Sequence, residues 1–202
     1  RQRSMRAATV PCLAAASLAL GGCAPTTRAA APTAAESPAG GATNPRWVDS
    51  VLAGMTLRDK AAQLVWPFIM GDYVADDSPG WTRMVRLVSE QHVGGFIMSV
   101  GSPLDIAAKT NALQRASQRA GIAPLLFSAD METGAGFRAR AGFFLPNAID
   151  LGGATVFPLA MGLGAIGDTA LAYRVGEVTA QEGRALGLHV SFGPVLDVNN
   201  NP

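Results

Sequence analysis

Apolar residues follow two alternating patterns along the chain, beginning near residue 46: stripes at helical spacing and short continuous runs. Helical stripes predict amphipathic helices, whereas short apolar runs bounded by turn residues predict strands. Helices are expected near 48–54, from 56, over 81–88, over 102–121 and over 168–186. Apolar runs occupy 64–70, 93–100, 125–127 and 188–197, of which the last three predict strands.

Capping residues mark where several of these helices begin and end. Thr56 with Asp59 three residues later resembles a capping box, and Ser102 before a proline resembles an N-cap. Gly121 and Gly187 follow the last periodic residues and are typical C-terminal stop signals. The pattern therefore predicts separate helices with defined ends.

The order of the elements predicts the fold class. Strands alternate with helices at spacings of about 30 residues, which favours a parallel sheet with right-handed crossovers. The pattern alone is compatible with a barrel and with an open sheet. A complete barrel needs about 250 residues, more than this folded part supplies. We therefore expect an α/β fold of the (β/α)8 TIM-barrel type, incomplete, with its N-terminal portion only.

The first residues have the pattern of an export signal. Arg1, Arg3 and Arg6 precede the apolar run 13–20, which is much shorter than the roughly 20 residues that span a bilayer. The run ends in Leu-Gly-Gly-Cys, which resembles the lipobox of bacterial lipoproteins and implies lipidation of Cys23. The alternative is an ordinary cleavage site with an incidental cysteine. The expected product is exported and membrane-anchored through lipid, facing the periplasm or the exterior.

The remaining N-terminal residues predict a tether. Residues 24–45 consist largely of Ala, Pro, Thr, Ser and Gly and cannot bury enough surface to offset their ordering entropy. We expect a lipoprotein signal peptide over 1–23, a disordered linker over 24–45 and the barrel portion over 46–202. Cys12 lies in the segment that would be removed, so no internal disulfide is expected.

Charge and composition narrow the function classes. About half of the residues are hydrophobic (49%), enough for a full core, and the formal net charge is only +1. Nucleic-acid binding is not expected, because there is no basic field to neutralise phosphates.

Candidate chemistry follows one predicted strand. The run Leu125–Phe127 is typical of a strand buried on both faces, and Asp130 ends it. A second acid follows at Glu132, and a loop broken by glycines leads to Arg138. Carboxylates at the carboxyl ends of parallel strands are typical ligand groups in α/β folds. A simple surface turn is the alternative.

Six segments resemble, in order and spacing, the N-terminal catalytic domain of family 3 glycoside hydrolases. The resemblance covers nearly everything from residue 47 to the end. Its last segment resembles the β-N-acetylhexosaminidase branch, and the Arg-Asp-Pro-Arg-Trp-Gly type sequence of the β-glucosidase branch is absent there. The segments are MTLRDKAAQL, VGGFIMSVG, PLLFSADMETGAGFR, FPLAMGLGAIGD, EVTAQEGRALG and SFGPVLDVNNNP.

The resemblance implies roles for individual residues. Asp130 matches an aspartate that hydrogen-bonds hydroxyls of the non-reducing terminal sugar, and Arg138 matches an arginine lining that subsite. Glu132 also matches the family pattern, and we expect loop bracing rather than catalysis from it. Asp197, at the predicted end of a strand, is an equal candidate for binding and for a structural role. The chain departs from the common hexosaminidase loop at Met131, Thr133 and Ala135.

The implied function is hydrolysis of terminal non-reducing β-N-acetylhexosamine residues by a retaining glycosidase, without cofactor or metal. In the family the nucleophilic aspartate and the acid/base histidine come from later segments, so both are expected beyond Pro202. The chain alone is therefore predicted to be inactive. His92 and His189 are expected to be structural. The alternatives are a β-glucosidase-type enzyme and a lipid-anchored sugar-binding protein.

A rival motif lies further along the chain. Gly162, Gly164 and Gly167 have the GxGxxG spacing of a dinucleotide-binding turn. The acid expected about 20 residues later, at the end of a second strand, falls instead within a predicted helix, as Glu182. We therefore favour glycines at a barrel turn over a dehydrogenase site. For Glu182 we predict a bracing salt bridge, because it shares a helical face with apolar residues.

Overall fold

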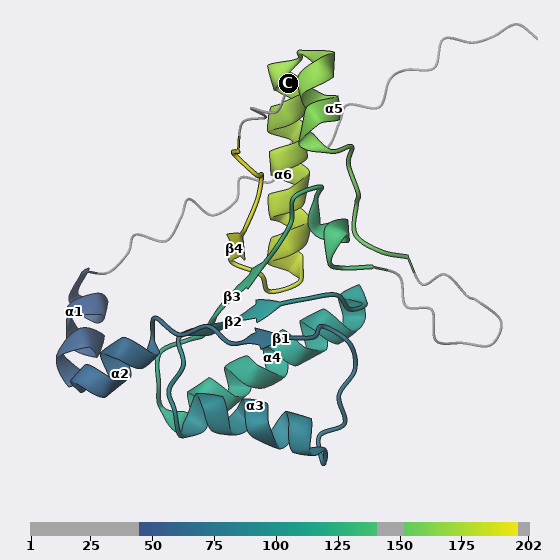
Figure 1. Cartoon of the computed structure of the whole chain (residues 1–202). Coiled ribbons are helices and arrows are strands. Elements are labelled where there is room, and N and C mark those ends of the chain that lie inside the picture. Colours follow the sequence, from purple (N-terminus) through teal and green to yellow (C-terminus); the bar gives the residue numbers. More distant parts are fainter. Residues whose placement is uncertain (1–44, 141–151, 198–202) are drawn as a thin grey trace, which may run out of the picture. The chain divides into compact units, whose positions relative to one another are not determined.

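A computed structural model describes residues 45–140 and 152–197, all within the compact unit Thr43–Pro202. The fold is α/β, with four parallel strands in the order β1-β2-β3-β4 (Figure 1). The strands are β1 Phe68–Ile69, β2 Gly95–Met98, β3 Leu126–Ala129 and β4 Val190–Ser191. The helices are α1 Pro45–Gly54, α2 Leu57–Ala62, α3 Pro79–Ser89, α4 Pro103–Ala120, the 3-10 helix η1 Ala135–Phe137, α5 Ala160–Ile166 and α6 Thr169–Ala185.

The register of the sheet brings the carboxyl ends of the strands to one edge. Ile69 of β1 pairs with Met98 of β2, Met98 with Ala129 of β3, and Ala129 with Ser191 of β4. All of these pairings are parallel. Loops that leave the carboxyl ends of adjacent parallel strands meet at the same rim, where ligand sites of α/β folds lie.

The predicted helix caps are confirmed. The Thr56 hydroxyl accepts a hydrogen bond from Asp59 N at 3.2 Å, and the Asp59 carboxylate accepts one from Thr56 N at 3.0 Å. Ser102 accepts from the third residue of its helix, and Gly121 ends that helix in the left-handed conformation, with φ 68°. These local signals set where α2 and α4 begin.

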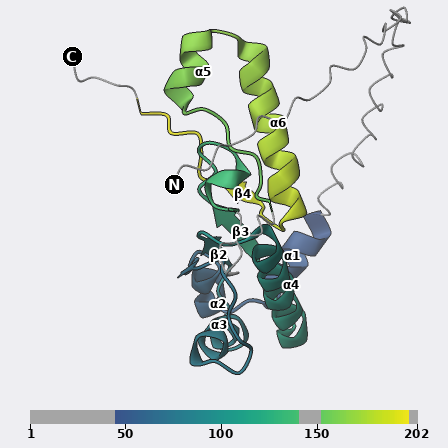
Figure 2. The same ribbon diagram turned by 90° about the vertical axis from the view of Figure 1, so that its right-hand side faces the viewer.

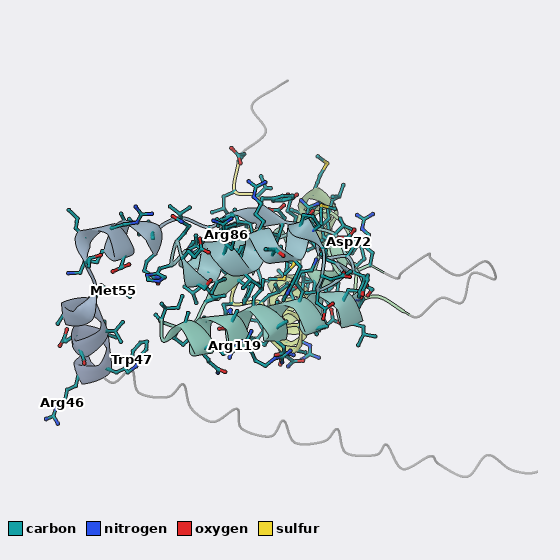
Figure 3. The ribbon with its side chains drawn as sticks, turned by 90° about the horizontal axis from the view of Figure 1, so that it is seen from below. Arg46, Trp47, Met55, Asp72, Arg86 and Arg119 are labelled. Carbon is teal, nitrogen blue, oxygen red and sulfur yellow. The ribbon has the colours of Figure 1, made fainter. Side chains whose placement is uncertain are left out.

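One face of the sheet packs on α3 and α4, which run side by side (Figures 1 and 3). Val88 of α3, Leu113 of α4 and Phe96 of β2 are fully buried in the core that these elements share. Phe96 also stacks on Phe127 of β3, with 6.1 Å between ring centroids. Their burial supplies the main hydrophobic stabilisation of this layer.

The opposite face of the sheet is open among the described residues. Phe68 is 60% exposed and Leu126 is 44% exposed. The sequence predicted burial on both faces of the strand that contains Leu126. This is wrong at Leu126, whereas Ser128, on the same face of β3, is fully buried. An apolar run shows only that a strand is able to be buried on both faces. Here α3 and α4 cover one face of the sheet.

The last strand ends earlier than predicted. β4 stops at Ser191, although Phe192 N still donates to Ala129 O at 2.9 Å. Pro194 follows, and a proline has no N–H to continue a ladder. Asp197 therefore does not end a strand, which corrects the expectation from the sequence.

The glycine motif does not form a dinucleotide turn. Gly162 and Gly164 lie inside α5, and Gly167 ends that helix in the left-handed conformation, with φ 71°. A phosphate-binding turn would need these glycines between a strand and the start of a helix. The dehydrogenase alternative is therefore excluded. The predicted turn holds only for Gly167, which lies between α5 and α6. Figure 2 shows α5 beside the first part of α6.

The export signal and the linker lie outside the described residues, apart from Pro45. Cys23 and Cys12 belong to that part of the chain. Of the helices over 45–140 and 152–197, none has the length and apolar character needed to cross a bilayer.

Candidate functional site

Asp130 directly follows β3, at the rim formed by the carboxyl ends of the strands. The Arg138 Nη2 donates a hydrogen bond to Asp130 Oδ2, and the two side chains are 24% and 30% exposed. The structure thus brings together the two residues that the sequence predicted for sugar binding. A half-buried carboxylate beside a guanidinium can both accept and donate hydrogen bonds to a polar ligand.

The Arg138 guanidinium has binding capacity left over. It lies over the Phe137 ring, 4.7 Å from the centroid, which fixes its plane. Its Nε is buried and has no hydrogen-bond partner among the described residues. A buried donor without a partner is costly. Because this Nε is buried, a ligand would meet the outer N–H groups of the guanidinium instead.

The loop that carries Arg138 fits closely against the segment 154–157. Gly136 N donates to Thr155 O at 3.0 Å, and Phe157 N donates to Thr133 O at 2.8 Å. A Cβ added at Gly136 would lie 2.2 Å from Ala154 O, closer than real atoms approach. Glycine is therefore required at this contact.

A second neighbour holds the loop from the β2 side. Gly101 N donates to Arg138 O at 3.1 Å, and Arg140 N donates to Gly101 O at 2.9 Å. Gly101 follows β2, so the backbone of Arg138 is tied to the same rim as Asp130. The local sequence thus builds a loop with little freedom at its functional end.

Glu132 lies apart from the pair formed by Asp130 and Arg138. It lines a cavity of about 640 Å³ beside α5 and α6, and neither Asp130 nor Arg138 lines it. Small and apolar side chains of the two helices make up most of that wall, so it offers few groups to a sugar. Asp197 is exposed and has no hydrogen bond or ion pair with any described residue.

Both histidines have partners at the amino ends of strands, away from the rim. His92 Nδ1 lies 2.8 Å from Asp59 Oδ1, before β2 begins. His189 Nδ1 accepts from Phe127 N at 3.1 Å, before β4 begins. Partial desolvation of the ring, with a smaller contribution from Arg184, lowers the pKa of His189 although part of the residue is exposed, and favours the neutral ring that this hydrogen bond requires.

The sequence analysis missed Lys109, a buried lysine at the same rim. Its Nζ donates to Met70 O and to Asp72 O, both at 2.5 Å, and Asp72 Oδ1 is 4.0 Å away. Burial lowers its pKa, partly opposed by Asp72 and Asp105. One sequence feature could have indicated its burial: Lys109 lies on the apolar stripe of α4, three residues after Ile106. In Figure 3, Asp72 lies at one end of the α3–α4 layer, and Met55 lies beyond the other end, on the connection between α1 and α2.

The prediction of a salt bridge for Glu182 is wrong among the described residues. Glu182 Oε2 accepts from Thr155 N at 2.8 Å, and Oε1 accepts from the Thr155 hydroxyl at 2.7 Å. Sequence periodicity placed the side chain on α6 but could not identify a partner so far away along the chain. Thr155 was not recognised at all.

The arrangement defines a class of protein: parallel βα units with a carboxylate and a guanidinium at the carboxyl rim, as in barrel enzymes that bind polar ligands. Residues 56–202 match the model of the glycosyl hydrolase family 3 N terminal domain, and the chain belongs to this family. Its fold is part of a TIM-type barrel, as in the neighbouring solved structures.

Known relatives carry more than one specificity in their names. A β-N-acetylglucosaminidase/β-glucosidase of Cellulomonas fimi is 31% identical over 155 residues, 77% of this chain and 23% of that protein. A periplasmic β-glucosidase/β-xylosidase of Dickeya chrysanthemi is 30% identical over 120 residues, 57% of this chain and 17% of that one.

A solved structure agrees with these relatives. A family 3 β-N-acetylglucosaminidase from Paenibacillus sp. is similar with a TM-score of 0.56 and 33% identity, covering 73% of this chain and 25% of that one. The chain thus spans about a quarter or less of the length of these proteins.

Proposed function

We propose that this chain forms the N-terminal part of a retaining glycosidase that removes terminal non-reducing β-N-acetylhexosamine residues. The observation that carries the proposal is the pair of Asp130 and Arg138 at the carboxyl rim. We assign both residues to the subsite for the terminal sugar. The family membership and the names of the relatives support a glycosidase.

The free atoms of the pair suit a sugar ring. Asp130 Oδ1 has no hydrogen bond to a described residue, so it can accept a sugar hydroxyl. A guanidinium N–H of Arg138 that Asp130 does not engage can donate to a second oxygen of the same ring. Two charge-assisted hydrogen bonds from a fixed loop orient the ring for attack at its anomeric carbon.

Hydrolysis needs two further groups. A retaining glycosidase holds a carboxylate nucleophile and an acid/base group about 5 Å apart around the glycosidic bond. We place both groups outside residues 1–202, as the resemblance implies. Glu132 and Asp197 are kept as accessory candidates, Glu132 for loop bracing and Asp197 for binding or structure.

The preference for an N-acetylhexosaminide over a glucoside rests on two observations. One is the sequence ending VLDVNNNP, and the other is that some relatives are named as β-N-acetylglucosaminidase or β-hexosaminidase. A β-glucosidase-type specificity is the second candidate, supported by the other names. The test is to express the complete gene product and compare kcat/KM for p-nitrophenyl β-N-acetylglucosaminide and p-nitrophenyl β-glucoside. We expect a preference of at least about tenfold for the N-acetylglucosaminide.

Three results would contradict parts of this proposal. A preference for the glucoside would favour the second candidate. Inversion of configuration at the anomeric carbon, detected by NMR, would exclude the retaining mechanism. Absence of turnover with measurable sugar binding would favour a lipid-anchored sugar-binding protein.

We also propose that Cys23 anchors the protein through lipid, with 1–23 as signal peptide, 24–45 as linker and 46–202 as barrel portion. The support is the order of basic flank, apolar run and Leu-Gly-Gly-Cys. One relative is named as periplasmic, which is compatible with export.

A further inference from the structure

We infer that Glu182 is a positioning residue: it fixes the loop that carries Arg138, and so the sugar subsite, by binding Thr155. The inference rests on the proposed function for its catalytic consequence. The geometric part concerns α6, the segment 154–157 and the loop 133–139, and can be tested without a sugar.

The first step is the contact between α6 and the segment. Glu182 Oε2 accepts from Thr155 N at 2.8 Å, and Oε1 accepts from Thr155 Oγ1 at 2.7 Å. Both carboxylate oxygens therefore bind one residue, which fixes the position of that residue along the helix.

The second step is the contact between the segment and the loop. Thr155 O accepts from Gly136 N at 3.0 Å, so a single residue joins Glu182 to the middle of the loop. Phe157 N donates to Thr133 O at 2.8 Å, and Ala154 N donates to Ala139 O at 3.0 Å. The segment is thus paired to the loop on both sides of Arg138.

The third step is the close packing of the loop backbone against the segment 154–157. A Cβ at Gly134 would lie 2.6 Å from Thr155 O, and a Cβ at Gly136 would lie 2.2 Å from Ala154 O. Because the two backbones already touch, a displacement of Thr155 must displace the loop. Arg138, two residues after Gly136, would move relative to Asp130.

The contact uses the carboxylate as an acceptor, and a glutamine can replace it. In Glu182→Gln the amide oxygen can accept from Thr155 N, and the amide nitrogen can donate to Thr155 Oγ1. In Glu182→Ala both hydrogen bonds are lost. Glu177→Ala is the matched control, because Glu177 lies on the same helix and pairs with Arg174 at the exposed surface.

The geometric test is hydrogen exchange in the complete gene product. We expect the amides of Gly136 and Phe157 to exchange at least about tenfold faster in Glu182→Ala than in wild type. Glu182→Gln and Glu177→Ala should exchange like wild type. In Thr155→Val, which replaces the hydroxyl with a methyl group, the exchange rates of these amides should fall between those of wild type and Glu182→Ala. In the double variant, Thr155→Val should add little to the effect of Glu182→Ala.

The catalytic test uses the complete gene product and the N-acetylglucosaminide. We expect Glu182→Ala to lower kcat/KM about tenfold or more, since only a fraction of molecules would hold the loop in the competent position. Glu182→Gln should retain wild-type kcat/KM with an unchanged pH profile, because the charge is not used.

The outcomes distinguish the inference about Glu182 from the proposed glycosidase function. Unchanged exchange at Gly136 and Phe157 in Glu182→Ala would overturn the inference, and so would a Gln variant as impaired as the Ala variant. If wild type hydrolyses no β-glycoside, the proposed function fails, and the exchange result alone decides whether Glu182 holds the loop. Faster exchange with normal kcat/KM would overturn the link between the loop and the subsite.

Discussion

At the scale of single residues, Asp130 is the most informative test of the site. In the complete gene product, Asp130→Ala removes charge-assisted hydrogen bonds, each worth about 1.5–3 kcal/mol. We expect kcat/KM to fall roughly ten- to two-hundredfold, with a loss in kcat as well as a rise in KM. Asp130→Asn keeps the volume and one acceptor, so its kcat/KM should fall between those of wild type and Ala. Folded variants that both stay within about twofold of wild type would make Asp130 a turn residue.

Gly136 tests whether the loop depends on close backbone contact. Gly136→Ala would place a Cβ 2.2 Å from Ala154 O, so the loop or its neighbour must shift. We expect a loss of about 1–3 kcal/mol in the free energy of unfolding, measured by urea titration. The control is Gly164→Ala inside α5, where a Cβ would meet nothing within 4 Å. That change should stabilise by up to about 1 kcal/mol, because alanine is the better helix former. Equal effects of the two substitutions would refute the close-contact argument.

At the scale of elements, the start of α2 gives a pH dependence whose sign is defined. The hydrogen bond from Thr56, and then the one from His92, lower the pKa of Asp59 to about 2, from 3.8. Because the folded-state pKa is depressed, this carboxylate contributes stability above pH 3.8 and loses it as the pH falls toward 2. We expect Asp59→Asn to flatten the decline in the free energy of unfolding between pH 5 and 2, measured by urea titration at several pH values.

The control for this experiment is Asp76→Asn, which changes an exposed carboxylate on the connection from β1 to α3. It should leave the acid part of the stability profile close to that of wild type. If Asp59→Asn and wild type lost stability in parallel over this range, the capping hydrogen bonds would not be the source of the acid sensitivity.

The elements also show which features a sequence can predict. The capping box of Thr56 and Asp59, and the helix stop at Gly121, depend on neighbours within a few residues, so the pattern alone located them. The end of β4 and the partner of Glu182 depend on contacts between distant segments. Local pattern carries no information on such contacts.

The site residues also divide into those that the sequence located and those that depend on contacts between distant segments. The position of Asp130 follows from the end of an apolar run, and the family resemblance added the assignment of Arg138. The buried Lys109 and the contact through Thr155 were missed, because each is polar and binds backbone groups of a remote loop. Burial of a lysine is rare enough that an apolar stripe alone does not predict it.

At the scale of the whole molecule, the anchor can be tested in cells. If Cys23 is lipidated, the complete gene product should fractionate with membranes, and Cys23→Ser should block lipid attachment and processing. The readout is incorporation of labelled fatty acid together with the distribution between membrane and soluble fractions. Cys12→Ser is the control, because Cys12 lies within the segment proposed to be removed. Processing and fractionation of Cys23→Ser identical to those of wild type would exclude the lipobox.

The last prediction concerns the 202-residue chain on its own. The open sheet face exposes Phe68 and Leu126, at 60% and 44%, and β1 and β4 each lack a partner on one side among the described residues. Exposed apolar surface and unpaired strand edges promote association, so we expect concentration-dependent oligomers by light scattering. We also expect no turnover of p-nitrophenyl β-N-acetylglucosaminide, because the proposed nucleophile and acid/base group lie outside these residues.

The complete gene product, purified in parallel, is the positive control for turnover and should scatter as a defined species. Activity that remains with the 202-residue chain after stringent purification would show that residues 1–202 contain a nucleophile and an acid/base group. Glu132 and Asp197 would then be the first carboxylates to substitute. A chain that is monomeric at all concentrations would refute the expectation that the exposed sheet face promotes association.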